Sequence, residues 1–339
     1  MTMLARTDRS LLGNWWWTVD RVLLLTIALL AAVGVVLIFA ASPAVAEKVY
    51  GDGMRFVEKH VLFLLPASLV LVGISLLNPR GVLRLAFLVF GLFGILMILT
   101  LFFASDIKGA HRWLNIGGAP LQPSEFVKPA LAVIVAYLLS RRPGLGGLPI
   151  TLAFVLPALV ILVRQPDIGM AAVICLVYGV QLFLAGIPWF VVIGFGGVGA
   201  LGLWQAYAHL QHFRQRVDDF MDPDSVGYQV EQALRAVAQG GLFGRGPGEG
   251  VTKFRLPDAH ADFIFAATAE EFGIIACLGL VGLFSFLILR GLFKVNETND
   301  RFILLAGAGL VAQLGFQAVI NMAVNLNLMP TKGMTLPFI

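Results

Sequence analysis

The residues with the clearest chemical potential lie in the stretch RLPDAHADFIF, at positions 255–265. Asp258, His260 and Asp262 alternate there, and an apolar run follows directly. In a strand the three side chains would share one face and could ligate a metal ion. Pro257 favours a helix instead, because proline suits the first helical position. We therefore predict a helix that begins at Pro257, in which His260 points away from the two carboxylates, and we expect no metal ion at these residues.

The two carboxylates have different expected roles in that helix. Asp258 lies near the helix N-terminus, where the helix dipole stabilises an acid by roughly 0.3 to 1 kcal/mol. Asp262 lies one turn deeper, beside the apolar residues 263–265. Desolvation beside apolar side chains makes a carboxylate a stronger base. Asp262 is therefore predicted to be a general base at the edge of a membrane, acting on a substrate with a polar head outside and a lipid tail within.

The composition indicates a membrane protein. The chain has 339 residues, of which 58% are hydrophobic and only 13% charged, against about 25% charged in soluble domains. Continuously apolar runs approach the roughly 20 residues that cross a bilayer. Continuous runs predict helices, because the strands of a membrane barrel alternate in polarity. The predicted fold class is all-α, a polytopic helix bundle with about nine spans. The runs are 22–41, 61–77, 82–104, 125–140, 149–163, 168–186, 188–207, 263–289 and 302–324.

The distribution of Lys and Arg favours a cytoplasmic N-terminus. With that orientation residues 1–21 form a cytoplasmic segment, and residues 22–339 form one membrane domain. The inside loops then contain Arg80, Arg84, Arg141, Arg142, Arg290, Lys294 and Arg301. The net charge is only +4, and no basic amphipathic tract is present, so we expect no nucleic acid partner.

Loop 208–262 is extracytoplasmic in this orientation and contains 14 of the 44 charged residues and three of the five histidines. Loops of this length are commonly functional. The segment GYQVEQALRAVAQ, residues 227–239, has the apolar spacing of a short interfacial helix. GGLFGRGPGEG follows at 240–250 with six glycines. It is either a flexible connector or a backbone that must approach a ligand closely.

Further polar groups flank the spans. Arg112 and Trp113 pair a cation with an amphipathic ring, a common interface anchor. Ser124 is predicted to cap the following helix, and Glu125 and Lys128 could pair at i, i+3. Together with Gln122 these residues cluster where that span begins.

RQPDIG, residues 164–169, lies between two spans, and Glu270 and Glu271 lie within one. Arg164 and Asp167 either close a tight turn as an ion pair or take part in function. Ionisable residues at membrane depth are candidates for functional sites. Cys175 and Cys277 lie in predicted spans and are interpreted as small buried hydrophobes.

Six motifs in order resemble the SEDS (shape, elongation, division and sporulation) family, and the likeness extends from about residue 20 to the end. The TKG at 331–333 and the preceding NMAVNLN resemble the division-type branch of the family more than its elongation-type branch. The motifs are GAHRWLNIGG, LQPSEFVKP, RQPDIG, GYQVEQALRAVAQGGLFGRGPGEG, LPDAHADFIFAATAEEFG and NLNLMPTKGMTLPFI.

The resemblance implies a peptidoglycan glycosyltransferase that polymerises lipid II, the undecaprenyl-pyrophosphate-linked disaccharide peptide, outside the bacterial cytoplasmic (inner) membrane at the septum. It implies a class B penicillin-binding protein of FtsI type as partner, further division proteins (FtsQ, FtsL, FtsB and FtsN) and surrounding membrane lipids. It assigns no cofactor, and a divalent cation such as Mg²⁺ that assists the leaving pyrophosphate stays an open alternative.

The resemblance also assigns residues. The essential acid of the family falls on Asp262, and His260 is expected to contact or orient the substrate. Asp258 stands where the family has Glu, and Ala261 where it has Thr. Cations for the pyrophosphate are predicted at Arg112, Lys128, Arg164 and Lys253, with backbone N–H groups of 240–250 nearby. The complete set expected to bind substrate is Arg112, Trp113, Gln122, Ser124, Glu125, Lys128, Arg164, Gln165, Asp167, Lys253, His260 and Lys332.

The family pattern continues with S-Y-G-G and a tenth span, whereas the sequence stops at Ile339, so we expect nine of the ten family spans here and expect that difference to bear on activity. Two other functions fit many apolar spans: a flippase for lipid II and a scaffold that recruits the crosslinking enzyme. A flippase predicts polar groups on both membrane faces, whereas nearly all the candidates here lie on one. A scaffold gives no reason for an acid at Asp262.

Overall fold

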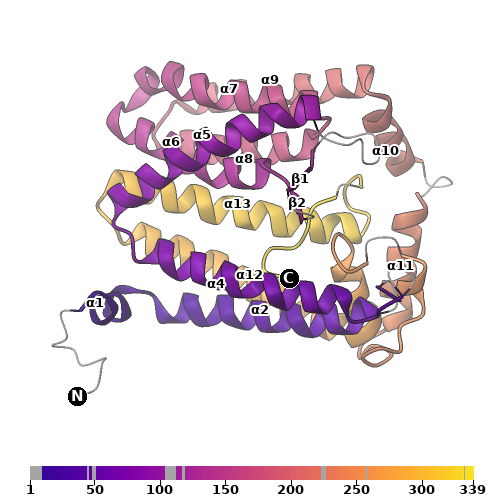
Figure 1. Cartoon of the computed structure of the whole chain (residues 1–339). Coiled ribbons are helices and arrows are strands. Elements are labelled where there is room, and N and C mark those ends of the chain that lie inside the picture. The colour runs from indigo at the N-terminus through magenta and orange to yellow at the C-terminus, as the bar shows by residue number, and fades with distance from the viewer. Residues whose placement is uncertain are drawn as a thin grey trace. The chain divides into compact units, whose positions relative to one another are not determined.

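The computed structural model describes residues 10–43, 46, 47, 51–103, 112–116, 119–222, 227–256, 259–331 and 333–339, and these are almost entirely helical (Figure 1). The helices are α1 (Leu11–Thr18), α2 (Arg21–Ala41), α4 (Arg55–Ser75), α5 (Pro79–Phe103), α6 (Ser124–Arg141), α7 (Leu148–Arg164), α8 (Ile168–Leu184), α9 (Trp189–His209), α10 (Gln211–Met221), α11 (Tyr228–Gly240), α12 (Ile264–Asn296) and α13 (Arg301–Asn325), with short 3-10 turns at Gly144–Gly147 and Thr252–Phe254. One antiparallel hairpin, β1 (Leu114–Ile116) with β2 (Ala119–Leu121), is the exception to the predicted all-α class.

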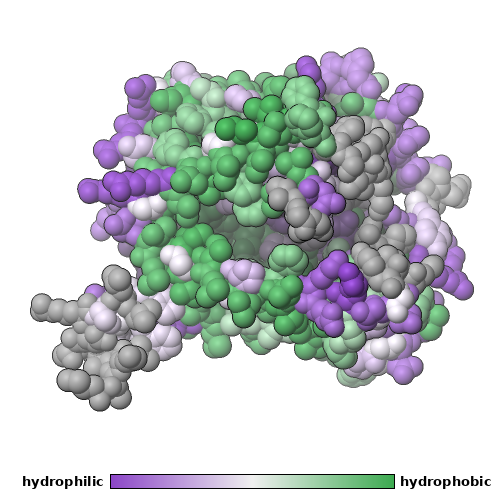
Figure 2. All heavy atoms as spheres, viewed as in Figure 1, coloured by the Kyte–Doolittle hydropathy of each residue, from purple (hydrophilic) through white to green (hydrophobic). Residues whose placement is uncertain are grey.

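Each of the nine predicted spans coincides with a helix, which confirms a multi-pass helical membrane protein. Among the described residues, seven helices are long and apolar enough to cross a bilayer: α2, α4, α5, α7 with its preceding turn, α9, α12 and α13. α8 is apolar but shorter, and α6 contains Glu125, Lys128 and Arg141. Figure 2 shows hydrophobic residues on the sides of the helices and hydrophilic residues gathered toward their ends, as lipid exposure requires.

The chain divides into two compact units. The first comprises Met1–Leu77, Gln215–Arg290 and Gln317–Ile339, and the second comprises Asn78–Arg214 and Gly291–Phe316. In the second unit α6 packs against α5, α7 and α8. Ala130, Val133 and Ile134 of α6 are buried there, because apolar positions surround nearly its whole circumference.

In the first unit Asp20 begins α2 and holds it to α12. Its carboxylate accepts hydrogen bonds from the backbone N–H groups of Val22 and Leu23, and it forms a bidentate pair with Arg290 at 3.1 and 2.9 Å. Burial acts to raise the pKa of Asp20, but the bonds from Arg290 and the two amides outweigh it, so the pKa lies below its ordinary value. The pair therefore contributes stability above the unfolded pKa and loses it as the pH falls through the folded one.

The predicted span 263–289 is one helix in sequence but contains a break. Gly273 in α12 has φ 82° and ψ 177°, which are not helical. Backbone groups of α12 that lose their partners within the helix at this break form hydrogen bonds with the glycine-rich loop, residues 240–250. Ile274 N donates to Gly241 O at 3.0 Å, and Arg245 N donates to Glu270 O at 2.9 Å. The loop and the helix thus form one structural element.

We expect Gly273→Ala to destabilise the protein by at least about 1–3 kcal/mol, because its positive φ strains an L residue and a Cβ there would lie 2.3 Å from Leu242 O. Gly282→Ala is the matched control, since a Cβ at that position of α12 meets nothing within 4 Å, and alanine there should be neutral or stabilise by up to about 1 kcal/mol. Thermal unfolding of the purified proteins in detergent measures both. Equal midpoints for the two variants would contradict the role of the break.

The helix predicted to begin at Pro257 begins seven residues later, at Ile264. Pro257 and Asp258 lie outside the described residues, so the capping role of Asp258 stays a prediction. Residues 259–263 form a turn. The physical reason for the late start is that side chains of α13 bind the carbonyl of Asp262, which would otherwise accept a bond from the first helical turn.

Candidate active site

Asp262 lies in the turn that precedes α12 and is partly buried. Asn321 Nδ2 and Asn325 Nδ2, one turn apart on α13, donate to its backbone carbonyl at 2.9 and 3.0 Å. Asn325 Oδ1 also accepts from Ala266 N at 3.0 Å, which caps α12. Two buried amides therefore fix the position of the Asp262 backbone.

The segment that follows α13 folds back against this turn. Asn321 Nδ2 donates to Met334 O, and Leu336 is buried. A Cβ atom at Gly333 would lie 2.9 Å from Asp262 Oδ2, so the TKG motif brings bare backbone against the carboxylate. Lys332, the predicted substrate-binding residue of that motif, lies outside the described residues.

His260, two residues before Asp262, packs against α4. Its ring stacks on that of Phe56 with centroids 4.0 Å apart and planes at 23°. Stacking fixes the plane of the imidazole and is consistent with the predicted orienting role, which the contacts of the protein alone do not test.

In the second unit the β1–β2 hairpin joins three of the motifs. Arg112 lies two residues before the start of β1, and Gln122 directly follows β2. Because the ends of an antiparallel pair lie side by side, both side chains reach Asp167: Arg112 Nη1 is 3.7 Å from Asp167 Oδ1, and Gln122 Nε2 donates to Oδ2 at 3.2 Å. Asp167 also caps α8 through Met170 N. Asp167 therefore pairs with Arg112. An ion pair with Asp167 was one of the two alternatives for Arg164, which is exposed at the end of α7.

Arg112 also holds the turn between α7 and α8. Its Nε donates to Gln165 O at 3.3 Å and its Nη2 to Pro166 O. The Gln165 side chain is buried and donates to Met97 O at 2.9 Å and to Thr100 Oγ1. Trp113 is 36% exposed, as an interface residue would be.

The first turns of α6 contribute a buried cation. Lys128 Nζ lies 2.9 Å from Glu125 Oε2 and 3.1 Å from Met170 Sδ, which confirms the i, i+3 pair. The Lys128 side chain is 1% exposed. Ser124 does not cap the helix as predicted, because the N-cap is Pro123 and Ser124 is the first helical residue, 2% exposed.

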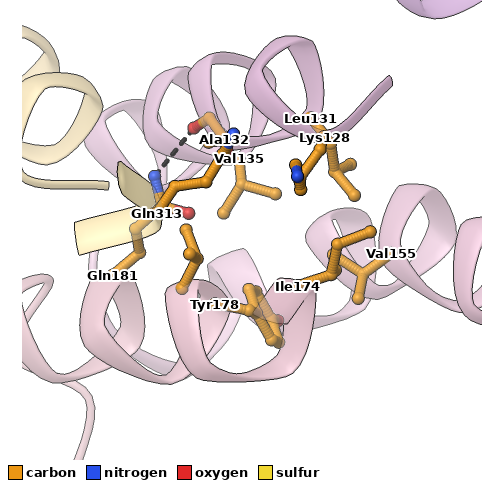
Figure 3. A pocket seen from close by; sticks show the side chains of 10 residues that line it. Lys128, Leu131, Ala132, Val135, Val155, Ile174, Tyr178, Gln181 and Gln313 are labelled. Carbon is orange, nitrogen blue, oxygen red and sulfur yellow. Dashed lines mark hydrogen bonds between the residues drawn. The ribbon is translucent and has the colours of Figure 1, made fainter. Parts of the chain in front are cut away.

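Lys128 borders a small cavity of about 10 Å³, room for about one water molecule. Figure 3 shows Lys128 on one side of it and the amides of Gln181 and Gln313 on the other. Gln181 Nε2 donates to Ala132 O at 2.7 Å and to Leu305 O at 3.2 Å. Lys128, Gln181 and Gln313 therefore place polar side chains in the interior of the second unit.

A second buried charged cluster underlies the glycine-rich loop. Glu270 accepts from the backbone N–H groups of Val251, Thr252 and Lys253 at 2.8, 2.6 and 3.0 Å. Glu271 accepts from Gly248 N and pairs with Lys253 Nζ at 2.6 Å.

Lys253 Nζ also donates to Ala40 O and Gly248 O at 3.0 and 2.9 Å, and the residue is 3% exposed. The glycines do permit close backbone approach, but the described contacts are to α12 and its carboxylates. These contacts give Lys253 and the loop a structural role, and their predicted binding of phosphate stays a prediction.

The helix predicted at 227–239 is confirmed as α11, its interfacial location stays a prediction, and α10 was not predicted. Sequence reasoning also missed the roles of Asn321, Asn325 and Gln181. Asparagines four residues apart share one helix face, and amides within an apolar span need partners, so these signals were available.

Cys175 and Cys277 are free thiols. Among the described residues no group of three His, Cys, Asp or Glu side chains could hold a metal ion, and the divalent cation remains a prediction.

Arg112→Lys tests the Asp167 cluster. Lysine keeps the charge but loses the planar fork that reaches Asp167 and two carbonyls at once, and bonds to charged groups are worth about 1.5–3 kcal/mol. We expect a loss of stability of that size, measured by unfolding in detergent. Arg142→Lys, at an exposed C-cap of the same unit, should change stability by less than about 0.5 kcal/mol. Equal losses in the two variants would refute the structural importance of the cluster.

Comparison with known proteins identifies the family. The model of the FtsW/RodA/SpoVE family, described as cell cycle proteins, matches residues 20–339. The chain belongs to this family.

Relatives in the family are similar over nearly the whole chain. A protein of Caulobacter vibrioides, named probable peptidoglycan glycosyltransferase FtsW, is 44% identical over 99% of this chain and 87% of its own length. A protein of the same name from Trichlorobacter lovleyi is 33% identical over 94% of this chain and 87% of its own.

Two solved structures share the fold of this FtsW/RodA/SpoVE family member. A chain from a study of how a peptidoglycan synthase complex coordinates polymerization and crosslinking has a TM-score of 0.80 at 27% identity, covering 95% of this chain and 92% of that one. The rod shape determining protein RodA of Thermus thermophilus has a TM-score of 0.70 at 28% identity, covering 95% and 90%.

Proposed function

We infer that this chain is a peptidoglycan glycosyltransferase of the FtsW type, which polymerises lipid II into glycan strands during cell division. The observation that carries the inference is the 44% identity over 99% of the chain to a relative of that name. The polar groups around Asp262 and around Arg112 and Lys128 support it. The structure adds Asp262, an acid whose backbone is fixed by two amides, and Lys128, a buried cation on α6.

Asp262 is proposed as the general base. Its carboxylate accepts the proton of the 4-hydroxyl of the acceptor N-acetylglucosamine while that oxygen forms a bond to C1 of the donor sugar. The bond from C1 to the pyrophosphate oxygen breaks, undecaprenyl pyrophosphate leaves from the opposite face, and the anomeric centre is inverted. The position of Asp262 supports this role, because its turn is fixed at the start of the span α12. A substrate there can have its sugar outside the bilayer and its lipid tail within it.

The departing pyrophosphate gains negative charge and needs cations. Arg112 and Lys128 are proposed for this role, and Arg164 is a third candidate because it is exposed. Gln122, Glu125, Gln165 and Asp167 are proposed to position them: Asp167 orients Arg112, and Glu125 holds Lys128. Trp113, Ser124, His260 and Lys332 remain predicted contacts of the substrate.

We propose a membrane-bound crosslinking partner, a class B penicillin-binding protein, and a location at the septum of the cytoplasmic membrane with Asp262 on the outer side. Support for a partner comes from the solved neighbour, which belongs to a complex that both polymerises and crosslinks. Support for the orientation comes from the positive charges of the inside loops.

The test is a polymerisation assay with the purified complex of this chain and its penicillin-binding partner in lipid vesicles, given labelled lipid II. Glycan strands resolved on a gel are the expected product. If lipid II crosses the bilayer and no strands form, the flippase would replace this proposal. If the partner crosslinks supplied glycan faster in the presence of this chain, which itself forms none, the scaffold would replace it.

A further inference from the structure

A cleft of about 620 Å³ lies in the second unit, and none of the residues of the polar clusters described above lines it. It is formed where α5 and α13 begin and α6 ends. The lining residues are Asn78, Pro79, Arg80, Leu83, Tyr137, Ser140, Arg141, Asp300, Arg301 and Phe302. Neither the enzymatic reaction nor any motif of the family resemblance accounts for it.

Three arginines and one aspartate line the cleft, but Asp300 and Arg301 already form hydrogen bonds with the backbone. Asp300 Oδ1 accepts from Phe302 N and Ile303 N at 2.8 and 3.2 Å, so the carboxylate caps α13. Arg301 Nη2 donates to Ala185 O at 2.5 Å, which ends α8. Arg80 and Arg141, both exposed, are therefore the charges that a ligand would meet, and the ligand is an anion.

Aromatic contacts hold Arg141 in place. Its guanidinium carbon lies 5.5 Å from the centroid of the Tyr137 ring. Tyr137 in turn meets Phe302 edge to face, with centroids 5.9 Å apart and planes at 88°. A guanidinium held against a ring loses less conformational freedom when it binds an anion.

The position of the cleft selects the kind of anion. Its residues mark the ends of three membrane helices, which is the level of the lipid headgroups. Leu83, Tyr137 and Phe302 give it an apolar wall, and along α5 the exposed side chains of Phe87 and Leu88 continue an apolar surface toward the bilayer interior. A phosphate with an acyl chain attached would contact both the arginines and the apolar surface. A soluble phosphate would contact only the arginines.

We propose that this cleft binds an anionic phospholipid, with its phosphate between Arg80 and Arg141 and an acyl chain along α5. A zwitterionic phospholipid carries an ammonium group that the same arginines would repel. With the N-terminus cytoplasmic, the site faces the cytoplasmic leaflet, where basic pockets between helices recognise anionic headgroups. The proposal does not depend on the enzymatic function.

The chain supplies a matched control for the general attraction between arginines and anionic membranes. Arg84 lies one turn beyond Arg80 on α5, and Arg142 follows Arg141; both are exposed, and neither lines the cleft. Arg80→Gln with Arg141→Gln, and Arg84→Gln with Arg142→Gln, remove the same charge from the start of α5 and the end of α6. Only the first pair removes it from the cleft.

Native mass spectrometry of the full chain in detergent, titrated with phosphatidylglycerol or phosphatidylethanolamine, tests the proposal. We expect tighter retention of phosphatidylglycerol by the unmodified chain. At about fivefold per arginine, the cleft double variant should weaken that binding by about 25-fold, and the control double variant by about twofold or less.

Four results would overturn the proposal. The chain could retain the two lipids equally, or the control variant could lose as much affinity as the cleft variant, which would indicate unspecific attraction. Alternatively, glycerol phosphate could displace the lipid at equal concentration, which would indicate a site for a free anion. Circular dichroism of both variants checks that each keeps its helices; a cleft variant that is folded and binds as before would also refute the site.

Discussion

Asp262→Asn is expected to lower the rate of lipid II polymerisation by about 10²- to 10⁴-fold, the usual contribution of a general base. Asparagine has nearly the shape of aspartate but cannot take up the proton of the attacking hydroxyl. The fold should survive, because Asn321 and Asn325 bind the backbone carbonyl of residue 262 and not its carboxylate. The rate of glycan formation by the complex with the partner is the measurement.

Asp219→Asn is the control for the lost charge. Asp219 is an exposed carboxylate on α10 in the same unit, and its replacement should leave the rate within about twofold. Thermal unfolding in detergent should give the same midpoint for both variants and the unmodified chain. Near-normal polymerisation by Asp262→Asn would show that Asp262 is not the general base, although the inferred activity would stand. A fall in both the rate and the unfolding midpoint would assign the residue a structural role.

The spans could be predicted because bilayer burial leaves a strong local signal. Each apolar run of α2, α5 or α9 must form its own backbone hydrogen bonds in lipid, so length and composition suffice. The helix α11 was predictable for a similar reason, since its apolar spacing is a property of its own residues.

The errors arose where distant residues replace local bonds. Pro257 was a reasonable local signal for a helix start, but the carbonyl of Asp262 is bound by amides some 60 residues later in the sequence. The break at Gly273 has the same origin, because the loop residues Gly241 and Leu242 supply acceptors that no pattern within α12 reveals. Likewise Asp167 pairs with Arg112 because the β1–β2 hairpin delivers that cation, while the nearer Arg164 is exposed.

The glycine-rich loop depends on a buried ion pair, and Lys253→Met is expected to destabilise the protein by about 3–5 kcal/mol. The Lys253 and Glu271 side chains are 3% and 1% exposed. Methionine fills a similar volume but leaves the carboxylate of Glu271 buried without its cation, which is the costly way to break such a pair. Arg245 lies in the loop that this pair fixes, so the variant should also be cut by trypsin there sooner than the unmodified chain.

Lys294→Met is the control, because Lys294 pairs with Glu297 at 2.7 Å with both side chains at least 44% exposed. Exposed pairs contribute about 0–1 kcal/mol. Unfolding in detergent should therefore separate the two lysines clearly. Equal, small losses would mean that water reaches Glu271 and that the loop is not fixed by charge.

A double variant then separates charge from packing. Adding Glu271→Gln to Lys253→Met removes the uncompensated charge, while the amide oxygen of glutamine can still accept from Gly248 N as Glu271 does. We expect the double variant to recover a large part of the lost stability, since two neutral groups of similar volume often replace a buried pair at little cost. If the double variant is as unstable as Lys253→Met alone, the loss would come from the bonds of Lys253 to Ala40 O and Gly248 O, and the pair would matter as a hydrogen-bond hub and not as a charge pair.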